Sequence, residues 1–389
     1  MNRRKTDYYD YNLVAVILLL VSFGLVMLYS TSSYVAEVKY GDDMYLFVHQ
    51  AIITAGAVVL ALILSLVDYH ILWYLSVPLY AAAMVLMGLV MTPLGVTRNG
   101  ARRWLRLIIE FQPSEVAKIA VIVCVPVIII MMGKQYKGWK GCVPPLVAGL
   151  LLALGAYVFT DNLSTGIIIL AIACVIVFVA HPQTKPFLII MAAGAVLLAG
   201  AIWLLWTFAD SANGSFRIQR ILVWRDPEAY PDSGGYQIMQ ALYAIGSGGI
   251  FGKGLGNSTQ KLGSLPEAQN DMIFSIICEE LGVFGGLIVI MLFIFLLYRL
   301  FFIAQNAPDL FGSLMVTGIF AHIALQVILN ICVVLNCIPT TGVTLPFISY
   351  GGTSVAFIMI EMAIALSVSR GIRFKRNQQD LWGEVSDFA

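Results

Sequence analysis

The stretch LVAVILLLVSFGLVMLYST, residues 13–31, decides the fold class of this chain. It has about 19 residues and no charged side chain, which is the length that an α-helix needs to cross the hydrocarbon core of a bilayer. Arg3, Arg4 and Lys5 precede it, but no small-residue cleavage site follows. The stretch therefore predicts a first spanning helix and not a removable signal peptide.

Nine further apolar runs predict further spanning helices. They lie near residues 47–66, 71–93, 116–132, 144–160, 163–181, 186–208, 272–298, 311–337 and 353–370. Of the 389 residues, 60% are hydrophobic and only 12% are charged, which excludes a water-soluble fold because too little charge remains to cover its surface. We therefore predict a single all-α integral membrane domain, residues 1–389, with about ten transmembrane helices. A long extracellular loop, 209–271, is expected between helices 7 and 8.

An even number of spans places both termini on one side, and the positive-inside rule makes that side the cytoplasm. The basic residues that then lie inside are Arg3, Arg4, Lys5, Lys134, Lys137, Lys140, Lys185, Arg299, Arg370, Arg373, Lys375 and Arg376. The first outer loop agrees, because Glu37, Asp42 and Asp43 outnumber its single Lys39.

Two predicted outer segments carry basic residues against this rule. Segment 92–115 contains Arg98, Arg102, Arg103 and Arg106, and loop 209–271 contains Arg217, Arg220, Arg225, Lys253 and Lys261. Either these side chains bind an anion outside, or the orientation is inverted. Inversion would misplace both termini and the lysine-rich segment 134–140, so we keep the first orientation. A net charge of +1 without a basic face gives no reason to expect a nucleic-acid partner.

The segment QPSEVAK, residues 112–118, predicts the start of a helix at the outer face. Its proline suits a first turn, and Glu115 suits the positive end of the helix. Lys118 follows Glu115 by three residues, so the two side chains share a face. The helix N-terminus, Lys118 and the nearby Arg102 and Arg103 predict an anion site suited to a diphosphate. The alternative is a local glutamate–lysine pair that only orients the helix end.

Glycines crowd the long loop in GYQ (235–237), GSGG (246–249) and GKGLGN (252–257). They predict tight turns and a close approach of the backbone to a ligand. A Walker A nucleotide loop is excluded, because Ser247 and Gly254 stand where that motif needs glycine and Ser or Thr.

Asp271 lies where this loop re-enters the membrane, at the predicted start of a helix. Near the positive end of a helix its carboxylate is expected to stay ionised and to act as a base. Glu279 and Glu280 lie about 12 Å further along that helix, too far for the carboxylate pair of a glycoside hydrolase. Glycosyl transfer from a diphosphate donor needs one base and cationic stabilisation of the leaving group, and this side of the bundle offers both.

The uncharged segment 339–354 predicts an irregular or re-entrant stretch, which a membrane protein tolerates only when it is buried or lines a polar cavity. Before it, His322, Gln326 and Asn330 share one predicted helix face, a pattern typical of hydrogen bonding between helices. The histidines show no metal-ligand spacing, so no structural zinc is expected. Glu361 fits no motif.

In this order, the motifs resemble the shape, elongation, division and sporulation family, which includes RodA, FtsW and SpoVE. They are NGARRW (99–104), QPSEVAK, QALYAIGSGGIFGKGLG (240–256), LPEAQNDMIF (265–274), EELG (279–282) and PTTGVTLPFISYGG (339–352). GLGNSTQKL (254–262) favours the FtsW and SpoVE branch. The resemblance implies a ten-helix enzyme of the bacterial cell membrane that polymerises lipid II into glycan strands. It also implies a class B penicillin-binding protein as partner.

By this resemblance Asp271 is the essential acid that deprotonates the acceptor hydroxyl, while Lys118, Glu115 and Arg102 match polar residues near the cavity. Glu280 in EELG is a weaker match. The expected substrate-binding residues on the outer side are therefore Lys118, Glu115, Arg102, Arg103, Arg217, Arg220, Lys253 and Glu280. The sequence DNLSTG at 161–166 departs from the Pro-Asp-Leu-Gly-Thr pattern of the family, so no role carries over there.

Two other functions stay open: a lipid II flippase or transporter that uses the same basic cavity, and a non-catalytic scaffold for division proteins. A transporter is expected to line both membrane faces with polar groups, whereas ionisable residues here concentrate in the outer half. Other division or elongation proteins and membrane lipid are expected partners. The sequence leaves open a divalent cation, Mg or Mn, at the diphosphate, and the choice among division, elongation and sporulation.

Overall fold

The computed structural model of this protein describes residues 8–98, 101–106, 110–183, 189, 196, 200 and 216–373. The helices are α1 (Tyr11–Tyr40), α2 (Tyr45–Leu64), α3 (Ile71–Leu89), α4 (Pro113–Met132), α5 (Val143–Thr160), α6 (Leu163–Ala180), α8 (Phe216–Arg225), α9 (Gly235–Gly248), α10 (Ile273–Asn306), α11 (Leu310–Val334) and α12 (Ser354–Arg370). Three strands, β1 (Gly95–Arg98), β2 (Ala101–Arg106) and β3 (Glu110–Phe111), and 3-10 turns at Gly133–Lys137, Trp139–Cys142 and Pro231–Ser233 complete the described elements.

The spanning helices lie near the predicted positions in the described part of the chain, but α1 continues to Tyr40, so Glu37 and Lys39 belong to this helix and not to the predicted outer loop. Eight helices there are long and apolar enough to cross a membrane: α1 to α6, α10 and α11. Helix α12 adds 17 residues, or about 26 Å at 1.5 Å per residue, close to the thickness of the hydrocarbon core. The predicted seventh span, 186–208, lies outside the described residues except for 189, 196 and 200. The structure thus confirms the all-α membrane fold.

Helix α4 lies at the centre of the bundle. Of its 20 residues 15 are buried, and it packs against α3, α5, α6, α11 and α12. In α2 and α3, only 5 of 20 and 3 of 19 residues are buried. All three helices are apolar on every side, so small residues, and not hydrophobicity, decide which surfaces meet. Gly149 of α5 shows this, because a Cβ there would lie 2.4 Å from Cβ of Ala173 in α6.

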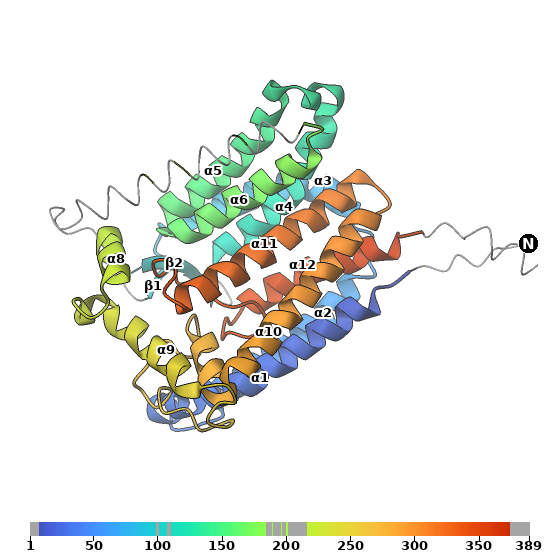
Figure 1. Ribbon diagram of the computed structural model, residues 1–389. Helices are drawn as coiled ribbons and strands as arrows, with labels where there is room; N and C mark the ends of the chain where they lie inside the picture. Colours follow the sequence, from blue (N-terminus) through green and yellow to red (C-terminus); the bar gives the residue numbers. More distant parts are fainter. Residues whose placement is uncertain are drawn as a thin grey trace, which may run out of the picture.

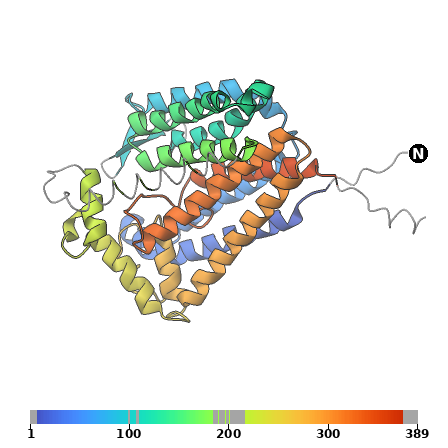
Figure 2. The same ribbon diagram turned by 45° about the horizontal axis from the view of Figure 1, so that its top comes forward.

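The two ends of the bundle differ in structure. The backbone N–H of Asp10 donates to Oγ of Ser369 at 3.4 Å, so the start of α1 and the end of α12 lie at one end. Helices α8 and α9 and the β-strands gather at the opposite end (Figures 1 and 2). The N- and C-terminal segments of the described chain therefore lie on the same side, as the even number of spans predicts.

Regular structure fills two segments that we predicted as loops. The strands form an antiparallel sheet in the order β1-β2-β3, which the sequence pattern did not predict. Gly246 and Gly248 lie inside helix α9, so the prediction of a turn at 246–248 is wrong. The reason is packing: a Cβ on Gly248 would lie 2.0 Å from the carbonyl oxygen of Cys278, so glycine allows α9 to approach α10.

Helix α10 is interrupted at Gly282, where φ is 71° and ψ is −174°. The glycine-rich turn after α9 inserts into this break. The N–H groups of Val283 and Phe284 donate to the carbonyls of Gly249 and Ile250 at 3.0 and 3.2 Å. In return, the N–H groups of Lys253 and Gly254 donate to the carbonyls of Glu279 and Glu280. We call residues 249–272, between α9 and α10, the glycine-rich loop. These hydrogen bonds attach the loop to the EELG motif of α10.

Segment 339–353 contains no helix or strand and reaches membrane depth, as predicted. A Cβ on Gly24, which lies near the middle of α1, would be 2.5 Å from the carbonyl oxygen of Phe347. Leu345, Phe347 and Ile348 are buried. Its backbone groups find partners inside the protein, including a bond from the N–H of Gly352 to Oε1 of Gln50 at 3.1 Å. We call residues 339–353 the re-entrant segment.

Candidate active site

Asp271 lies at the junction of the glycine-rich loop, the re-entrant segment and α10. It precedes Met272, whose backbone begins α10 without a side-chain cap. The side chain of Asn270 bonds to the carboxylate of Glu267 and does not cap the helix. Oδ1 of Asp271 is buried and has no hydrogen-bond partner within the described residues. One carboxyl oxygen of Asp271 therefore has its hydrogen-bonding capacity unused in the described part of the chain.

The electrostatic surroundings of Asp271 differ from the sequence-based prediction. Burial, followed by the negative charge of Glu267, raises the pKa of Asp271 to about 7, while its own backbone and the positive charge of Arg220 act in the opposite direction. We expected the helix end to keep this carboxylate ionised, but desolvation outweighs that effect. A pKa near neutrality suits a general base, since the proton it accepts can also be released.

Glu115 and Lys118 form a buried ion pair in the first turns of α4. Nζ of Lys118 lies 2.9 Å from Oε1 of Glu115, and both residues are less than 10% exposed. The local glutamate–lysine pair that we considered as an alternative is thus present. Oε2 of Glu115 is buried without a partner in the described part of the chain, so one carboxylate oxygen remains for a ligand or water.

Arg102 and Arg103 of β2 hold loop carbonyls. Arg102 donates through Nη1 to Met91 O at 3.3 Å and through Nη2 to Thr92 O, just after the end of α3. Nη2 of Arg103 donates to Asp161 O at 3.1 Å, at the end of α5. These bonds attach the sheet to the bundle. They use only some of the five N–H donors that each guanidinium group carries. A role of either arginine toward a diphosphate remains a prediction.

Arg220 is the basic residue of the long loop that acts on Asp271. It projects from α8, donates through Nη1 to Thr340 O at 3.0 Å, and lowers the pKa of Asp271 through its charge. It thus links α8 to the re-entrant segment beside the candidate base. Arg217 belongs to α8 as well, but its side chain lies outside the described residues.

Lys253 and Glu280 have partners that the sequence analysis did not predict. Nζ of Lys253 lies 2.6 Å from Oε1 of Glu279, which is fully buried. Glu280 pairs with Lys261 at 2.8 Å and accepts a hydrogen bond from Ser30 of α1 at 2.7 Å. The structure therefore assigns both residues to the attachment of the glycine-rich loop. Direct binding of substrate by either residue remains a prediction.

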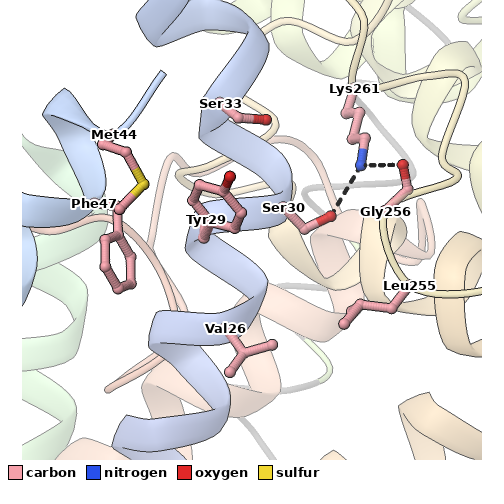
Figure 3. Close-up of a pocket in the computed structure, with 9 residues that line it drawn as sticks. All are labelled: Val26, Tyr29, Ser30, Ser33, Met44, Phe47, Leu255, Gly256 and Lys261. Carbon is pink, nitrogen blue, oxygen red and sulfur yellow. Dashed lines mark hydrogen bonds between the residues drawn. The ribbon is translucent and has the colours of Figure 1, made fainter. Parts of the chain in front are cut away.

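A cavity of about 610 Å³ lies beside this attachment, between α1, α2 and the loop. Figure 3 shows the amine of Lys261 pointing toward Ser30 and the carbonyl of Gly256. Lys261 had been noted only as a basic residue on the unexpected side of the membrane. Because Glu280 neutralises the buried ammonium group, the ion pair accounts for a lysine on the predicted outer side.

His322, Gln326 and Asn330 form a polar stripe on one face of α11. Contrary to the prediction, most of its hydrogen bonds go to loop carbonyls and not to neighbouring helices. Only His322 follows the prediction, because its Nδ1 lies 2.8 Å from Oε2 of Glu361 in α12, which gives Glu361 its partner. Gln326 donates to Thr344 O at 3.0 Å. Asn330 donates to Val343 O and to Asp271 O, both at 2.8 Å. The stripe thus holds the re-entrant segment and the backbone of the candidate base.

No group of three or more His, Cys, Asp or Glu side chains within the described residues is arranged to hold a metal ion.

Asp161, at the departure from the family pattern, has a left-handed backbone with φ of 45°, and Asn162 caps α6 by accepting a bond from Thr165 N at 3.1 Å. These residues end α5 and begin α6.

Comparison with known proteins identifies the family of this chain. The model of the FtsW, RodA and SpoVE family, described as cell cycle protein, matches residues 10–373. The chain belongs to this family. It is 37% identical to stage V sporulation protein E of Bacillus subtilis over 96% of its own length and all of that protein. It is 34% identical to the probable peptidoglycan glycosyltransferase FtsW of Trichlorobacter lovleyi, over 94% of each chain.

Solved structures of family members share the fold. A chain from a study of the structural coordination of polymerization and crosslinking by a peptidoglycan synthase complex aligns with a TM-score of 0.75 and 26% identity. That alignment covers 94% of this chain and 99% of the other. The rod shape determining protein RodA of Thermus thermophilus aligns with a TM-score of 0.64 and 26% identity, covering 94% of this chain and 98% of RodA.

Proposed function

We propose that this protein is a peptidoglycan glycosyltransferase that polymerises lipid II into glycan strands, with Asp271 as the general base. The observation that carries the proposal is the buried Oδ1 of Asp271, which has no partner among the described residues and belongs to a group whose pKa is about 7. Relatives named as probable peptidoglycan glycosyltransferases, matched over nearly the whole chain, support the same activity.

In the proposed reaction, the oxygen of the acceptor hydroxyl attacks the anomeric carbon of the donor sugar. The bond from that carbon to the diphosphate oxygen breaks, and its electron pair leaves with the lipid diphosphate. Asp271 accepts the hydroxyl proton, and the configuration at the anomeric carbon is inverted. Only one base is needed, which agrees with the engagement of Glu279 and Glu280 by lysines.

The leaving diphosphate needs cationic stabilisation. Lys118, Arg102, Arg103 and Arg220 are the candidates among the described residues. Lys118 is buried and has a carboxylate partner, so its contribution requires a ligand that approaches the Glu115 pair. Arg220 already acts electrostatically on Asp271. We therefore propose that Arg220 contacts the diphosphate close to Asp271, and we keep Arg217 as a further candidate.

The site is proposed to face the outside of the bacterial cytoplasmic membrane. The end of the bundle that carries α8 and α9 lies opposite to the terminal segments (Figure 1), and Arg220 of α8 acts electrostatically on Asp271. The positive-inside rule assigns those segments to the cytoplasm. A class B penicillin-binding protein is the proposed partner, because one structural relative is part of a peptidoglycan synthase complex.

The test is polymerisation of purified lipid II by the protein with its penicillin-binding partner, while a β-lactam blocks transpeptidation. We expect long glycan strands from the wild type and from Asp232→Ala, an exposed aspartate of the same loop, and none from a folded Asp271→Ala. Strands from Asp271→Ala would remove Asp271 from the mechanism. Absence of polymer from every variant, together with transfer of labelled lipid II across liposomes, would favour the flippase.

A further inference from the structure

Asn330 joins the candidate base to the re-entrant segment through a single carboxamide. Its Nδ2 donates to Asp271 O and to Val343 O, both at 2.8 Å, so both hydrogens of the amide are used. Asn330 is fully buried in α11. Its Oδ1 is buried without a partner in the described part of the chain.

The backbone of Asp271 depends on this bond because α10 does not satisfy it. An α-helical pattern would direct the N–H of Ser275 to the carbonyl of Asp271, but that N–H donates to Met272 O at 3.1 Å. Asp271 precedes α10, so its carbonyl has no partner in the first turn of that helix and is held by Asn330 of α11. A second bond, from the N–H of Tyr350 to Gln269 O at 2.8 Å, ties the same two segments together.

We infer that Asn330 is a positioning residue for the polymerisation reaction, holding the backbone of Asp271 so that its carboxyl group faces the acceptor hydroxyl. The inference rests on the proposed function. Without the amide, two buried carbonyls lose their donor, and the stretch before α10 can move. A displacement of about 1 Å at a reacting group can lower a rate by about 100-fold.

Gln326 provides a matched control. It lies one turn before Asn330 on the same face of α11, carries the same amide group and donates to Thr344 O, the carbonyl next to Val343. It has no bond to Asp271. Removing this amide disturbs the re-entrant segment to a similar degree while the contact to the candidate base remains.

The experiment measures kcat and KM for lipid II polymerisation from pH 5.5 to 9 in the complex with the penicillin-binding partner. For Asn330→Leu we expect kcat to fall by roughly 10- to 100-fold with little change in KM. The midpoint of the rise of kcat with pH, on the acid side of the profile, should also shift to lower pH. The reason is that a displaced Asp271 carboxyl group becomes more hydrated, which lowers its pKa. Gln326→Leu should keep the wild-type midpoint.

A second variant covers the case in which Asn330→Leu does not fold. Asn330→Asp keeps the shape, removes donor capacity and adds a carboxyl group near Asp271, so kcat should fall while the acid limb shifts to higher pH. Wild-type kcat and midpoint in the folded Asn330 variants would overturn the inference. So would a fall in kcat with an unchanged midpoint, which indicates a smaller folded fraction. An active Asp271→Asn protein would instead contradict the proposed function, so the two failures are distinguishable.

Discussion

Nζ of Lys261 lies 2.8 Å from Oε1 of Glu280, and both side chains are buried beneath the glycine-rich loop. Oγ of Ser30 lies within 2.8 Å of both oxygens of the same carboxylate. The loop, α10 and α1 are therefore held together by one ion pair and its hydroxyl partner. A lysine in the loop and a glutamate of the EELG motif act here as structural groups.

Removing one member of this pair should destabilise the protein more than removing both. Lys261→Met leaves a buried carboxylate without its cation, and the expected loss of unfolding free energy is about 3–5 kcal/mol. The double variant Lys261→Met with Glu280→Leu removes both charges and should recover much of that loss. Thermal unfolding in detergent of the wild type, Lys261→Met, Glu280→Leu and the double variant measures the interaction between the two residues. Losses that simply add would show that the two charges do not interact.

The activity of the wild type should rise with pH through about 7. A general base acts only when deprotonated, and the pKa of Asp271 is about 7. Glu267→Gln removes a negative charge that raises this pKa, so the acid limb should move to lower pH. Glu228→Gln, an exposed glutamate after α8, is the control. An unchanged limb in Glu267→Gln would contradict the assigned electrostatic coupling.

Asp271→Asn should abolish polymerisation and raise stability at alkaline pH. Because the folded-state pKa of Asp271 is raised to about 7 from 3.8, its ionisation opposes folding as pH increases between these values. The melting temperature of the variant should exceed that of the wild type at pH 8, and the difference should shrink as pH falls toward 4. A difference independent of pH would indicate another cause.

Gly252→Ala should disrupt the docking of the glycine-rich loop, because a Cβ there would lie 2.2 Å from Glu280 O. Gly256→Ala is the matched control, since Gly256 also has a positive φ, 83° against 79°, but no neighbour within 4 Å of an added Cβ. Backbone strain alone costs about 1–2 kcal/mol. Gly252→Ala should lose more stability and activity than Gly256→Ala. Equal losses would mean that strain, and not contact with α10, explains both.

The location of the candidate base could be predicted from the sequence, but its surroundings could not. Asp271 was selected because it stands at a loop–membrane boundary, which the chain itself defines. Its pKa depends on burial and on Glu267 and Arg220, and the last of these comes from a different helix. Asn330 shares a predicted polar helix face with His322 and Gln326, yet no local pattern distinguishes an amide that bonds a neighbouring helix from one that bonds a loop carbonyl.

The sequence by itself determined the all-α membrane fold, the position of each described spanning helix and the irregular segment 339–353. These follow from the length of apolar runs and from prolines and glycines, which act within a few residues. Only the tertiary structure decided which helix lies at the centre and how charges that are far apart in the sequence pair. The helices are apolar on every side, and partners such as Ser30 and Glu280 are 250 positions apart, so their contact exists only once the bundle packs.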